Sequence, residues 1–476
     1  MRPLRNTVFS AIVTGSRIVS VAVTMLLLAR GLGPTGFGQF TFALTLATVF
    51  AVIPDYGFSL QIVRAIASGP ERTHGLLRSA VQAKAILASI AVFAAVLWFL
   101  SRAPDAETAT TVGLLFLSFL FLSFGQLNSY AFRGSDRFDL DAVSALALNL
   151  ALLFAAGAAV IVTKSPVTVA LAYLGARALY LVVTWRLLRG IPADAQGTPG
   201  PRPVAVLRDG FPYGVHTAAS VLYVSIDTLV LEAYRGHAAV GIYQAGMRLV
   251  FASMFAPEIL TSGLFPSFAK ALARNDTGSA VTLARVMNRY MVLVGGTIVV
   301  ALALVPDAVR GVLFGRAYSS VDSLLIWFGV VIVFRYVSST YGAVITAAGA
   351  QSQRTMVGIL AMLLSLGANL VLIPRFGIAG AVVASVTTHG VLLVAYGWLC
   401  QRAVGQLLVP RRAALCATLL GSTVLVGVTV GVEASVAVRL VGVALAAAVA
   451  TTIVVTRQEW MSLLAMVSLS PRRAAR

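Results

Sequence analysis

The chain has 476 residues, of which 59% are hydrophobic and only 11% are charged, and its mean hydropathy is +0.90. Soluble domains carry a charge on roughly 25% of their residues, so a water-soluble globule of this length could not hide so much apolar surface. Disorder is excluded as well, because disordered chains are poor in hydrophobic residues. The net charge of +19 would usually indicate a nucleic-acid partner. Here the basic residues stand in short clusters between apolar runs, which instead indicates a membrane protein without nucleic acid.

Apolar runs of about 20 residues, the length that an α-helix needs to cross a bilayer, recur along the whole chain. A membrane β-barrel would show shorter, alternating strands. We therefore expect an all-α polytopic membrane protein with about 14 transmembrane helices. The first run follows Arg2 and Arg5 and is longer than the core of a cleaved signal peptide. The expected segments are 7–29, 39–63, 80–101, 109–130, 142–163, 167–188, 211–232, 241–267, 288–312, 323–348, 355–374, 377–399, 412–431 and 435–456.

The distribution of basic residues predicts the orientation of these segments. With the N-terminus in the cytoplasm, 24 Lys and Arg fall on inside segments, 7 on outside loops and 5 within helices. This bias follows the positive-inside rule and supports an even number of helices, with both termini in the cytoplasm and the chain in the cytoplasmic membrane. The two cysteines, Cys400 and Cys416, predict neither a disulfide framework nor a paired-cysteine metal site.

A Gly- and Pro-rich stretch at 190–210 predicts a cytoplasmic linker between two bundles of six helices. The expected domains are an N-terminal bundle at 1–189, a C-terminal bundle at 211–405, and helices 13 and 14 with a cytoplasmic tail at 406–476. Four residues after the first segment recur 205 positions later, after the seventh: Arg30, Gly31, Gly36 and Gln39 match Arg235, Gly236, Gly241 and Gln244. An offset of six helices preserves orientation, so the repeat predicts a pseudo-two-fold axis along the membrane normal.

Motifs of enzymes and of ATP-driven pumps are absent from the sequence. It contains no P-loop, no zinc-protease motif and no nucleophile elbow. We therefore expect no catalytic residue, no metal site and no cofactor. Asp139 and Asp141 form a lone D-x-D, which holds a metal in some glycosyltransferases. The interpretation that we favour is a solvated loop in which they lie beside Arg133 and Arg137.

Charged residues inside the apolar segments are the candidates for function. Each costs about 2.5–3.5 kcal/mol at the bilayer centre even on the lenient insertion scale, so together they must face water or one another. One hypothesis is structural pairing, for example of an aspartate with an arginine. The other is a cationic cavity for an anionic substrate, because the planar guanidinium binds phosphate oxygens in pairs. The residues of this set are Arg17, Asp55, Arg177, Asp227, Arg248, Glu258 and Arg335, with Arg439 near a helix end, where it can snorkel.

Several stretches resemble polysaccharide transporters. Asp227 to Leu231, followed by Arg235 to Leu249, is similar to their helix 7–8 signature, and Asn369 to Ala381 to their helix 11–12 turn. The glycine-rich run from Gly31 to Gly38 and the sequence from Asp55 to Gly57 also fit. On these motifs the chain is identified as a member of the oligosaccharide flippase (polysaccharide biosynthesis) group of the multidrug/oligosaccharidyl-lipid/polysaccharide exporter superfamily.

The resemblance implies two six-helix bundles that rock about a central cavity by alternating access. It implies export of a polyprenyl-diphosphate-linked oligosaccharide for exopolysaccharide, capsule or O-antigen assembly. We expect Arg17, Arg177, Arg248 and Arg335 to bind the anionic cargo. Asp55, Asp227 and Glu258 are candidates for ion coupling or pairing. The expected partners are the lipid-linked anionic oligosaccharide, membrane lipid, and a polysaccharide polymerase and glycosyltransferases.

Three alternatives stay open from the sequence. Lipid II flippases of the same superfamily share the arginine in the first helix, but here the charged landmark of the second helix is the acid Asp55. A multidrug antiporter would favour an acidic cavity for cationic drugs. A membrane polymerase or ligase acting on lipid-linked sugars would need a large external loop, whereas the longest one expected here has about a dozen residues. The glycan, the coupling ion and the oligomeric state are not encoded in any motif that we identify.

Overall fold

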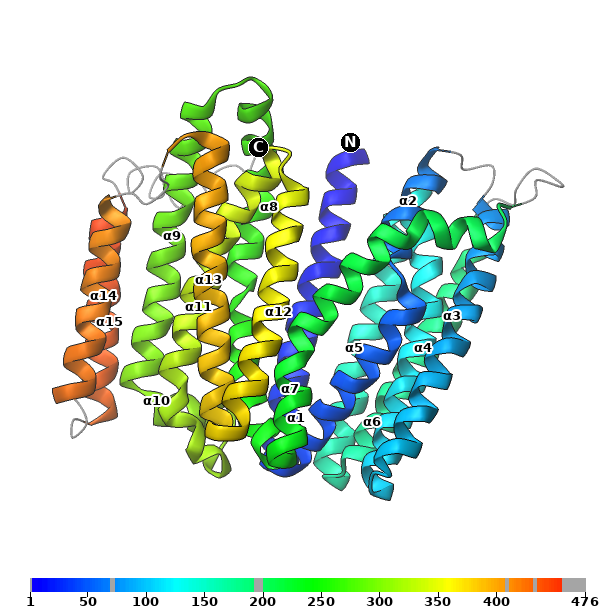
Figure 1. Cartoon of the computed structure of the whole chain (residues 1–476), viewed down its shortest axis with the longest axis horizontal. Coiled ribbons are helices and arrows are strands. Elements are labelled where there is room, and N and C mark those ends of the chain that lie inside the picture. Colours follow the sequence, from blue (N-terminus) through cyan, green and yellow to red (C-terminus); the bar gives the residue numbers. More distant parts are fainter. Residues whose placement is uncertain (1, 69–72, 192–199, 407–410, 431–434, 456–476) are drawn as a thin grey trace, which may run out of the picture. The chain divides into compact units, whose positions relative to one another are not determined.

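A computed structural model describes residues 2–68, 73–191, 200–406, 411–430 and 435–455 (Figure 1). All regular elements in these ranges are helices, as expected for a chain that must satisfy its backbone hydrogen bonds within lipid. Residues 192–199 of the expected linker and the expected tail at 456–476 lie outside the described residues. The helices are α1 (Arg2–Asp55), α2 (Phe58–Ser68), α3 (Thr73–Arg102), α4 (Ala106–Gly134), α5 (Phe138–Thr163), α6 (Pro166–Leu188), α7 (Pro203–Ser253), α8 (Phe255–Ala273), α9 (Thr277–Leu304), α10 (Pro306–Leu313), the 3₁₀ helix η2 (Arg316–Val321), α11 (Asp322–Ala347), α12 (Gln351–Phe376), α13 (Ile378–Val404), α14 (Arg411–Val430) and α15 (Val436–Val454).

Eleven helical stretches in the described residues are long and apolar enough to cross a membrane. Two of them, Ile12–Asp55 and Tyr213–Ala273, have 44 and 61 residues, which exceeds the roughly 20 residues that one crossing needs. Large apolar side chains such as Phe93, Leu100 and Val162 are exposed, a placement that is stable only when lipid surrounds the protein. The chain is therefore a multi-pass membrane protein, while the expected number of 14 crossings stays a prediction.

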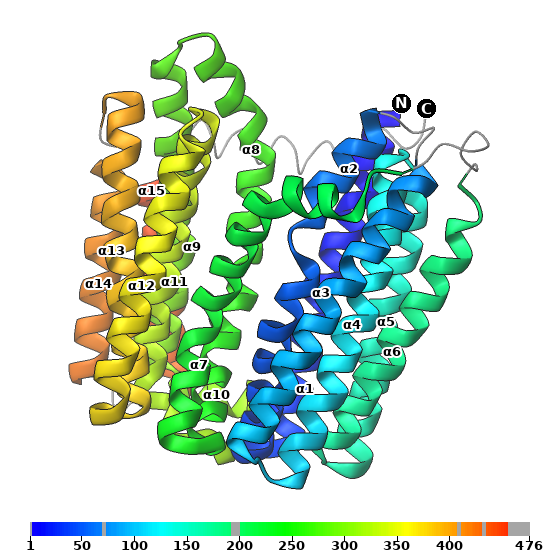
Figure 2. The ribbon, with the colours of Figure 1, turned by 45° about the vertical axis from the view of Figure 1, so that its right-hand side comes forward.

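The chain divides into two compact units, which are described separately. Unit 1 consists of Met1–Arg248, Leu313–Tyr318 and Met362–Ala384. In it, α4 packs on α6, α5 packs on α1 and α6, and α2 lies against α4 (Figure 2). Unit 2 consists of Leu249–Val312, Ser319–Ala361 and Ser385–Arg476. In it, α9 is central, with α8, α11, α14 and α15 packed on it.

Single glycines divide the two long helices α1 and α7. Gly33 has φ 67° and ψ 179°, and Gly236 has φ 73° and ψ −178°. Only glycine adopts this backbone conformation readily, because a Cβ would clash with the chain. The sequence predicted loops at 30–38 and 233–240, but helix continues up to each glycine and resumes directly after it. The equivalent breaks are 203 residues apart, so the offset of 205 matched the wrong glycine, Gly31, to Gly236.

The helices that follow the two breaks cross at glycines. A Cβ on Gly38 would collide with the carbonyl of His237, and a Cβ on Gly241 would collide with the carbonyl of Pro34. Pro34 and His237 each follow a break, and Gly38 and Gly241 each lie four residues further on. The contact is therefore reciprocal, as expected across a pseudo-two-fold axis.

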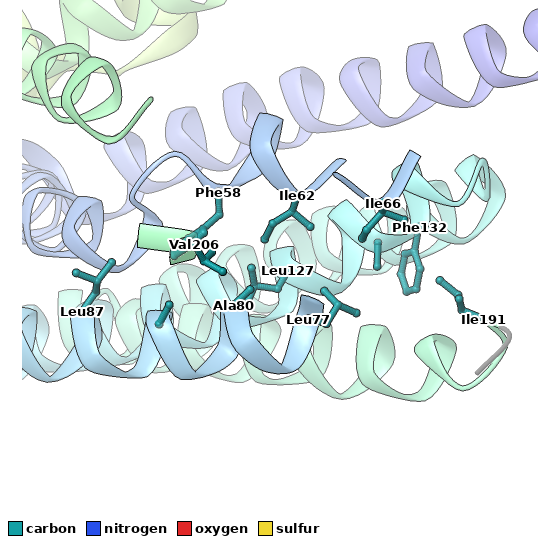
Figure 3. Packing of buried hydrophobic residues seen from close by; sticks show 12 residues of the cluster. Phe58, Ile62, Ile66, Leu77, Ala80, Leu87, Leu127, Phe132, Ile191 and Val206 are labelled. Atoms are coloured by element: carbon teal, nitrogen blue, oxygen red, sulfur yellow. The ribbon is translucent and has the colours of Figure 1, made fainter. Parts of the chain in front are cut away.

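A second break separates α1 from α2. Pro54 lacks a backbone N–H, and Tyr56 and Gly57 have φ 29° and 70°. The sequence predicted one uninterrupted segment at 39–63, which is wrong because these left-handed residues redirect the chain. After the break, α2 packs its apolar face into a buried cluster that joins α2, α3, α4 and α7 (Figure 3). Phe58, Ile62 and Ile66 contribute to it from α2. The break thus places Asp55 beside a packed core.

The remaining expected segments correspond to helices with shifted ends. The segment expected at 241–267 is interrupted at Met254, between α7 and α8, and the one expected at 288–312 ends at Leu304, before Pro306. The expected separation near Arg375 is confirmed, because Gly377 takes φ 59° between α12 and α13. In unit 2, Cys416 and Leu420 of α14 pack on Val300 of α9 in a buried cluster that α15 completes.

Candidate functional site

Arg177 of α6 is buried among helices of unit 1 with only 6% of its surface exposed. Its Nη1 donates a hydrogen bond of 2.8 Å to Ser118 Oγ on α4. Its guanidinium lies 3.8 Å from the centre of the Phe119 ring and 5.3 Å from that of Tyr173. In the described part of the chain it has no carboxylate within ion-pair distance, and its buried Nε has no hydrogen-bond partner. Arg177 therefore keeps donors that an anion could use.

Asp227 and Arg248 of α7 are joined by a chain of hydrogen bonds rather than by direct pairing. Arg248 Nη2 donates to Gln244 Oε1 at 3.1 Å, and Gln244 Nε2 donates to Thr228 Oγ1 at 2.5 Å. Thr228 Oγ1 in turn donates to Asp227 Oδ1 at 3.3 Å. The Tyr243 hydroxyl and the Thr228 backbone N–H also donate to Asp227. All donors point from the guanidinium toward the carboxylate, so the bonds polarise one another.

Arg335 of α11 lies in unit 2 against a histidine. Its Nη1 is 3.4 Å from His389 Nε2, its Nε is 3.4 Å from Met254 Sδ, and its guanidinium lies 5.6 Å from the Phe251 ring. His389 Nδ1 is 2.8 Å from the carbonyl of Ser385. Because a carbonyl only accepts, Nδ1 carries the proton and Nε2 accepts from Arg335. The neutral tautomer of His389 is thereby fixed by its two partners.

Asp55 pairs with Lys84, which the count of basic residues above included among the 24 on inside segments. Lys84 Nζ lies 3.2 Å from Asp55 Oδ1, 2.9 Å from the carbonyl of Ser123 and 2.6 Å from Ser123 Oγ. The Ser123 hydroxyl also donates to Asp55. The predicted pairing of Asp55 with an arginine is therefore replaced by an ion pair with Lys84. The available signal was its position, since Lys84 lies inside the apolar segment expected at 80–101 and is one of three lysines in the chain.

The structure brings part of the predicted set together. Arg177 and Arg248 both interact electrostatically with Tyr173, and Asp55 interacts electrostatically with Arg177. These residues all belong to unit 1, whereas Arg335 and Glu258 belong to unit 2. Arg17 on α1 and Glu258 on α8 have exposed side chains. Arg439, expected to snorkel, donates to the Leu304 carbonyl and pairs with Asp307 at 3.0 Å.

A polar cluster surrounds the start of α4. Asp105 is the N-cap of this helix, and its Oδ2 accepts from the backbone N–H of Thr108 at 3.0 Å. Thr108 Oγ1 accepts from Gln39 Nε2 at 3.2 Å and lies 3.3 Å from His237 Nε2. The hydrogen bonds from Thr108 lower the pKa of Asp105. The cluster joins α4 to the two helices that cross at Gly38.

The D-x-D residues form ion pairs at the start of α5. Arg133 Nε lies 2.8 Å from Asp141 Oδ2, and Arg137 Nη2 lies 2.9 Å from Asp139 Oδ2. Among the described residues no group of three or more His, Cys, Asp or Glu side chains could hold a metal ion. Both aspartates lie beside the two arginines as expected, but they stand in the first turn of α5 rather than in a solvated loop, and Asp141 is buried.

Two cavities lie between helices of unit 2. One of about 290 Å³ is bounded by α9, α11 and α14 and is lined by apolar side chains such as Val299, Val330 and Leu420. The other, of about 380 Å³, lies between α9, α14 and α15 and has Arg439 in its wall. The first cavity is therefore apolar, whereas Ser422, Thr423 and Arg439 bring polar atoms to the second.

Comparisons with known proteins agree with the resemblance seen in the sequence. The family described as "Polysaccharide biosynthesis protein" matches residues 4–272. A protein of Escherichia coli strain K12 described as a proposed O-antigen transporter is 23% identical over 353 residues, which are 71% of this chain and 82% of that protein.

Solved structures of transporters share the fold. The lipid II flippase MurJ in an inward closed conformation has a TM-score of 0.71 at 12% identity, over 94% of this chain and 98% of that chain. A multidrug resistance transporter of the MATE family in an inward-facing conformation has a TM-score of 0.64 at 15% identity, over 82% and 95%. A transporter of the MOP superfamily from Pyrococcus furiosus has a TM-score of 0.58 at 14% identity, over 85% and 96%.

Proposed function

Because this chain belongs to the polysaccharide biosynthesis protein family, we propose that it is a flippase which moves polyprenyl-diphosphate-linked oligosaccharide repeat units across the cytoplasmic membrane. It is then a transporter and not an enzyme, working by alternating access. The product would be used for exopolysaccharide, capsule or O-antigen assembly. The similarity to a proposed O-antigen transporter and the fold shared with MurJ support this function.

The observation that carries the proposal is the buried guanidinium of Arg177. A diphosphate cannot cross hydrocarbon unaided, since a desolvated charge costs many kcal/mol. A transporter must therefore offer donors inside the membrane, and Arg177 has a buried Nε without a partner among the described residues. We assign the cargo diphosphate and acidic sugars to Arg177 and Arg248, with Arg17 and Arg335 as further contacts.

The acidic residues are assigned to the driving ion. Asp227 is held by Tyr243, Thr228 and the hydrogen-bond chain from Arg248, so a change of charge at Asp227 would be felt at the cargo arginine. Asp55 and Glu258 complete the acidic set. In this proposal the cargo sites and the ion sites are linked through hydrogen bonds rather than separated.

The wider organisation of the proposal follows the sequence. We propose an N-terminal bundle at 1–189, a cytoplasmic linker at 190–210, a C-terminal bundle at 211–405, and helices 13 and 14 within 406–476, with both termini in the cytoplasm. The apolar cavity between α9, α11 and α14 is of a size to hold part of a lipid tail. Glycosyltransferases would supply the cargo, and a polysaccharide polymerase would consume it.

Transfer between leaflets of proteoliposomes tests the function. The purified protein is reconstituted with a fluorescent undecaprenyl-diphosphate trisaccharide, and protected label is measured after an external quencher is added. We expect transfer of this probe, slower transfer of lipid II, and no transport of the cationic drug ethidium. Preferred transfer of lipid II would support the lipid II alternative, and ethidium transport would support the antiporter.

The enzymatic alternative has its own signature in the same preparation. A polymerase would lengthen the labelled glycan, and a ligase would detach it from its lipid carrier, in both cases without transfer between leaflets. We expect the extracted probe to run unchanged in chromatography after incubation. Product formation without protection from the quencher would contradict the flippase and support an enzyme.

A further inference from the structure

The Lys84 side chain is the most deeply buried charged group in unit 1 for which the proposed cargo binding has no use. Only 1% of it is exposed. Its ammonium has three N–H groups, and three oxygens lie within hydrogen-bond distance: Asp55 Oδ1, the Ser123 carbonyl and Ser123 Oγ. The rings of Phe58 and Phe124 lie 5.4 Å and 6.0 Å from Nζ and close off the apolar side. Every donor of the ammonium is therefore satisfied.

The acceptors around Lys84 are those of a cation site. A carboxylate, a backbone carbonyl and a hydroxyl are the oxygen ligands that hard cations take in proteins. They come from the end of α1 and from α4, while Lys84 reaches them from α3. A lysine is a cation tethered to its own helix, so it occupies the position permanently and cannot be exchanged for sodium.

The two members of the pair differ in exposure. Asp55 has 35% of its side chain exposed, in contrast to Lys84. Asp55 is the last residue of α1 and lies directly before the break at Tyr56 and Gly57. No helical turn of α1 therefore follows the carboxylate. The other titratable groups that face Asp55 are Tyr130 of α4 and Arg177 of α6, and Tyr213 of α7 packs on Gly57. The carboxylate is thus the accessible member of the pair, and Lys84 does not cover it.

We propose that Asp55, Lys84 and Ser123 form a proton-binding site in which the lysine excludes sodium, and that among the acidic residues assigned to the driving ion it is Asp55 that binds the coupled proton. The coupling part rests on the proposed flippase function. A proton that binds Asp55 removes the negative charge opposite Lys84 and leaves a net positive charge close to Arg177. Because Asp55 and Arg177 interact electrostatically, proton binding and anion binding change each other's affinity by the same factor.

Sodium sensitivity provides the first test and needs no cargo. The thermal unfolding midpoint of the detergent-purified full chain is measured in NaCl and in choline chloride at equal concentration. We expect no sodium-specific shift for the wild type. Lys84→Ala leaves the oxygen ligands vacant and should gain a sodium-specific shift of several degrees, which Asp55→Asn/Lys84→Ala should lose. Lys164→Ala, which removes a lysine from the α5–α6 connection, should behave as the wild type.

Protonation of Asp55 provides the second test. Infrared difference spectra between acidic and alkaline buffer report the C=O stretch of a protonated carboxyl group. We expect a band in the wild type that is missing in Asp55→Asn/Lys84→Met. The double variant removes both charges, so that no buried charge is left without a partner and the fold is retained. Asp139→Asn, which removes an exposed carboxylate paired with Arg137, should keep the band.

Coupling is tested in the proteoliposome assay with the labelled trisaccharide lipid. We expect the wild-type rate to change several-fold when a pH difference is imposed, and to be unaffected by a sodium gradient. The double variant should transfer the probe at a rate that no longer responds to pH. A structural ion pair predicts instead that the double variant keeps the pH response of the wild type, and this result would overturn the proposal.

Other results also overturn it. A sodium-specific shift in the wild type, or the absence of an Asp55-dependent carboxyl band at any pH, would contradict the proton site. Absence of transfer in every variant, with the infrared and sodium results as expected, would instead contradict the flippase function and leave the proton site established. The two proposals therefore fail in different measurements.

Discussion

Arg177 and Lys84 are both buried cations, but the chemistry of their contacts differs. Lys84 has a carboxylate and two further oxygens, which satisfy all of its donors. Arg177 has one hydroxyl and two aromatic faces, and its Nε is left without a hydrogen bond among the described residues. A buried charge without a counterion is stabilised by binding one. This contrast separates a cation whose donors are all satisfied within the protein from one that is available to a ligand.

Replacement of Arg177 tests this availability. We expect Arg177→Met to reduce transfer of the trisaccharide lipid at least tenfold, because removing a charge-assisted hydrogen bond costs about 1.5–3 kcal/mol. Arg177→Lys keeps the charge but loses the planar fork, so it should retain part of the rate. Arg186→Met, at an exposed position in the last turn of the same helix, serves as the control. Full activity of Arg177→Met would contradict the anion site.

Thr228 is expected to transmit charge between Asp227 and Arg248, since its hydroxyl accepts from Gln244 and donates to Asp227. Thr228→Val preserves the shape but interrupts the chain and leaves the Gln244 amide without its acceptor, at a cost of about 1–3 kcal/mol. We expect transfer to slow by about tenfold or more, as measured in proteoliposomes, while Thr282→Val at an exposed site of α9 changes nothing. Equal rates for the two variants would show that Asp227 and Arg248 act independently.

At this scale the sequence predicted which residues are unusual but not what they touch. Hydropathy alone is enough to single out Arg177, Asp227 and Arg335, because a charge within an apolar run is conspicuous. Their partners depend on how each helix is rotated about its axis, and no motif reports that rotation. Lys84 was counted with the inside segments for the same reason, since its position near a segment end fits either environment. A partner that is neutral, such as His389, leaves no charge signal at all.

At the scale of elements, the reciprocal crossing of the two helices after Gly33 and Gly236 depends on glycines at the contact. A methyl group at Gly38 would meet the carbonyl oxygen of His237, and backbone cannot move aside as a flexible side chain can. Because the backbones touch, the crossing brings together Gln39, Thr108 and His237. The close approach is therefore required for the polar cluster as well as for packing.

A pair of glycine substitutions tests the crossing. We expect Gly38→Ala to destabilise the protein by about 1–3 kcal/mol through overpacking. Gly113→Ala in α4, where a new Cβ would meet no atom within 4 Å, should be neutral or stabilise by up to about 1 kcal/mol. Chemical denaturation in detergent, followed by circular dichroism, compares the two variants. The crossing would be refuted by equal stabilities.

The N-cap of α4 gives a prediction about pH. Hydrogen bonds from Thr108 lower the pKa of Asp105 below its unfolded value, so the stabilisation is present above the unfolded pKa of about 3.9 and is lost as pH falls through the lower folded pKa. At pH 7 we expect Asp105→Ala to cost about 0.5–2 kcal/mol. The difference between wild type and variant in the thermal unfolding midpoint should shrink as the buffer is acidified below a pH of about 3.9. A difference independent of pH would exclude the carboxylate as the cap.

Helix boundaries were predicted less well than the helices themselves. Apolar length predicted nearly every helix, because the bilayer requires one continuous hydrogen-bonded segment for each crossing. The sequence predicted loops at 30–38 and 233–240, but it did not predict that each interruption is a single residue, Gly33 or Gly236, with helix on both sides. The repeat was detected from Arg-Gly pairs, yet its register follows from backbone conformation, which aligns Gly33 with Gly236. Composition thus predicts the crossings, and backbone geometry fixes the connections.

At the scale of the whole molecule, the bias of basic residues predicts the orientation in the membrane. Cysteine labelling tests it in intact cells, in a background where Cys400 and Cys416 are replaced by serine. We expect Lys164→Cys, between α5 and α6, to react with a membrane-impermeant maleimide, and Arg274→Cys, between α8 and α9, to react only after permeabilisation. The reverse pattern would invert the topology and place the expected cytoplasmic termini outside.

At this scale the sequence was enough to predict the family. Motifs such as Asp227 to Leu231 indicated the family, and the family match over residues 4–272 confirmed it. The arginines within the helices suggest an anionic cargo, and this stays a prediction. The glycan is not predictable from the same residues, because guanidinium groups recognise phosphate without reading the sugars attached to it.

The contact at Gly38 and Gly241 has a mechanical consequence. Two helices whose side chains interlock as ridges in grooves must separate before their crossing angle can change. At Gly38 and Gly241 backbone meets backbone with no interlocked side chains between, so we expect the two helices to change their crossing angle more readily here than at a side-chain contact.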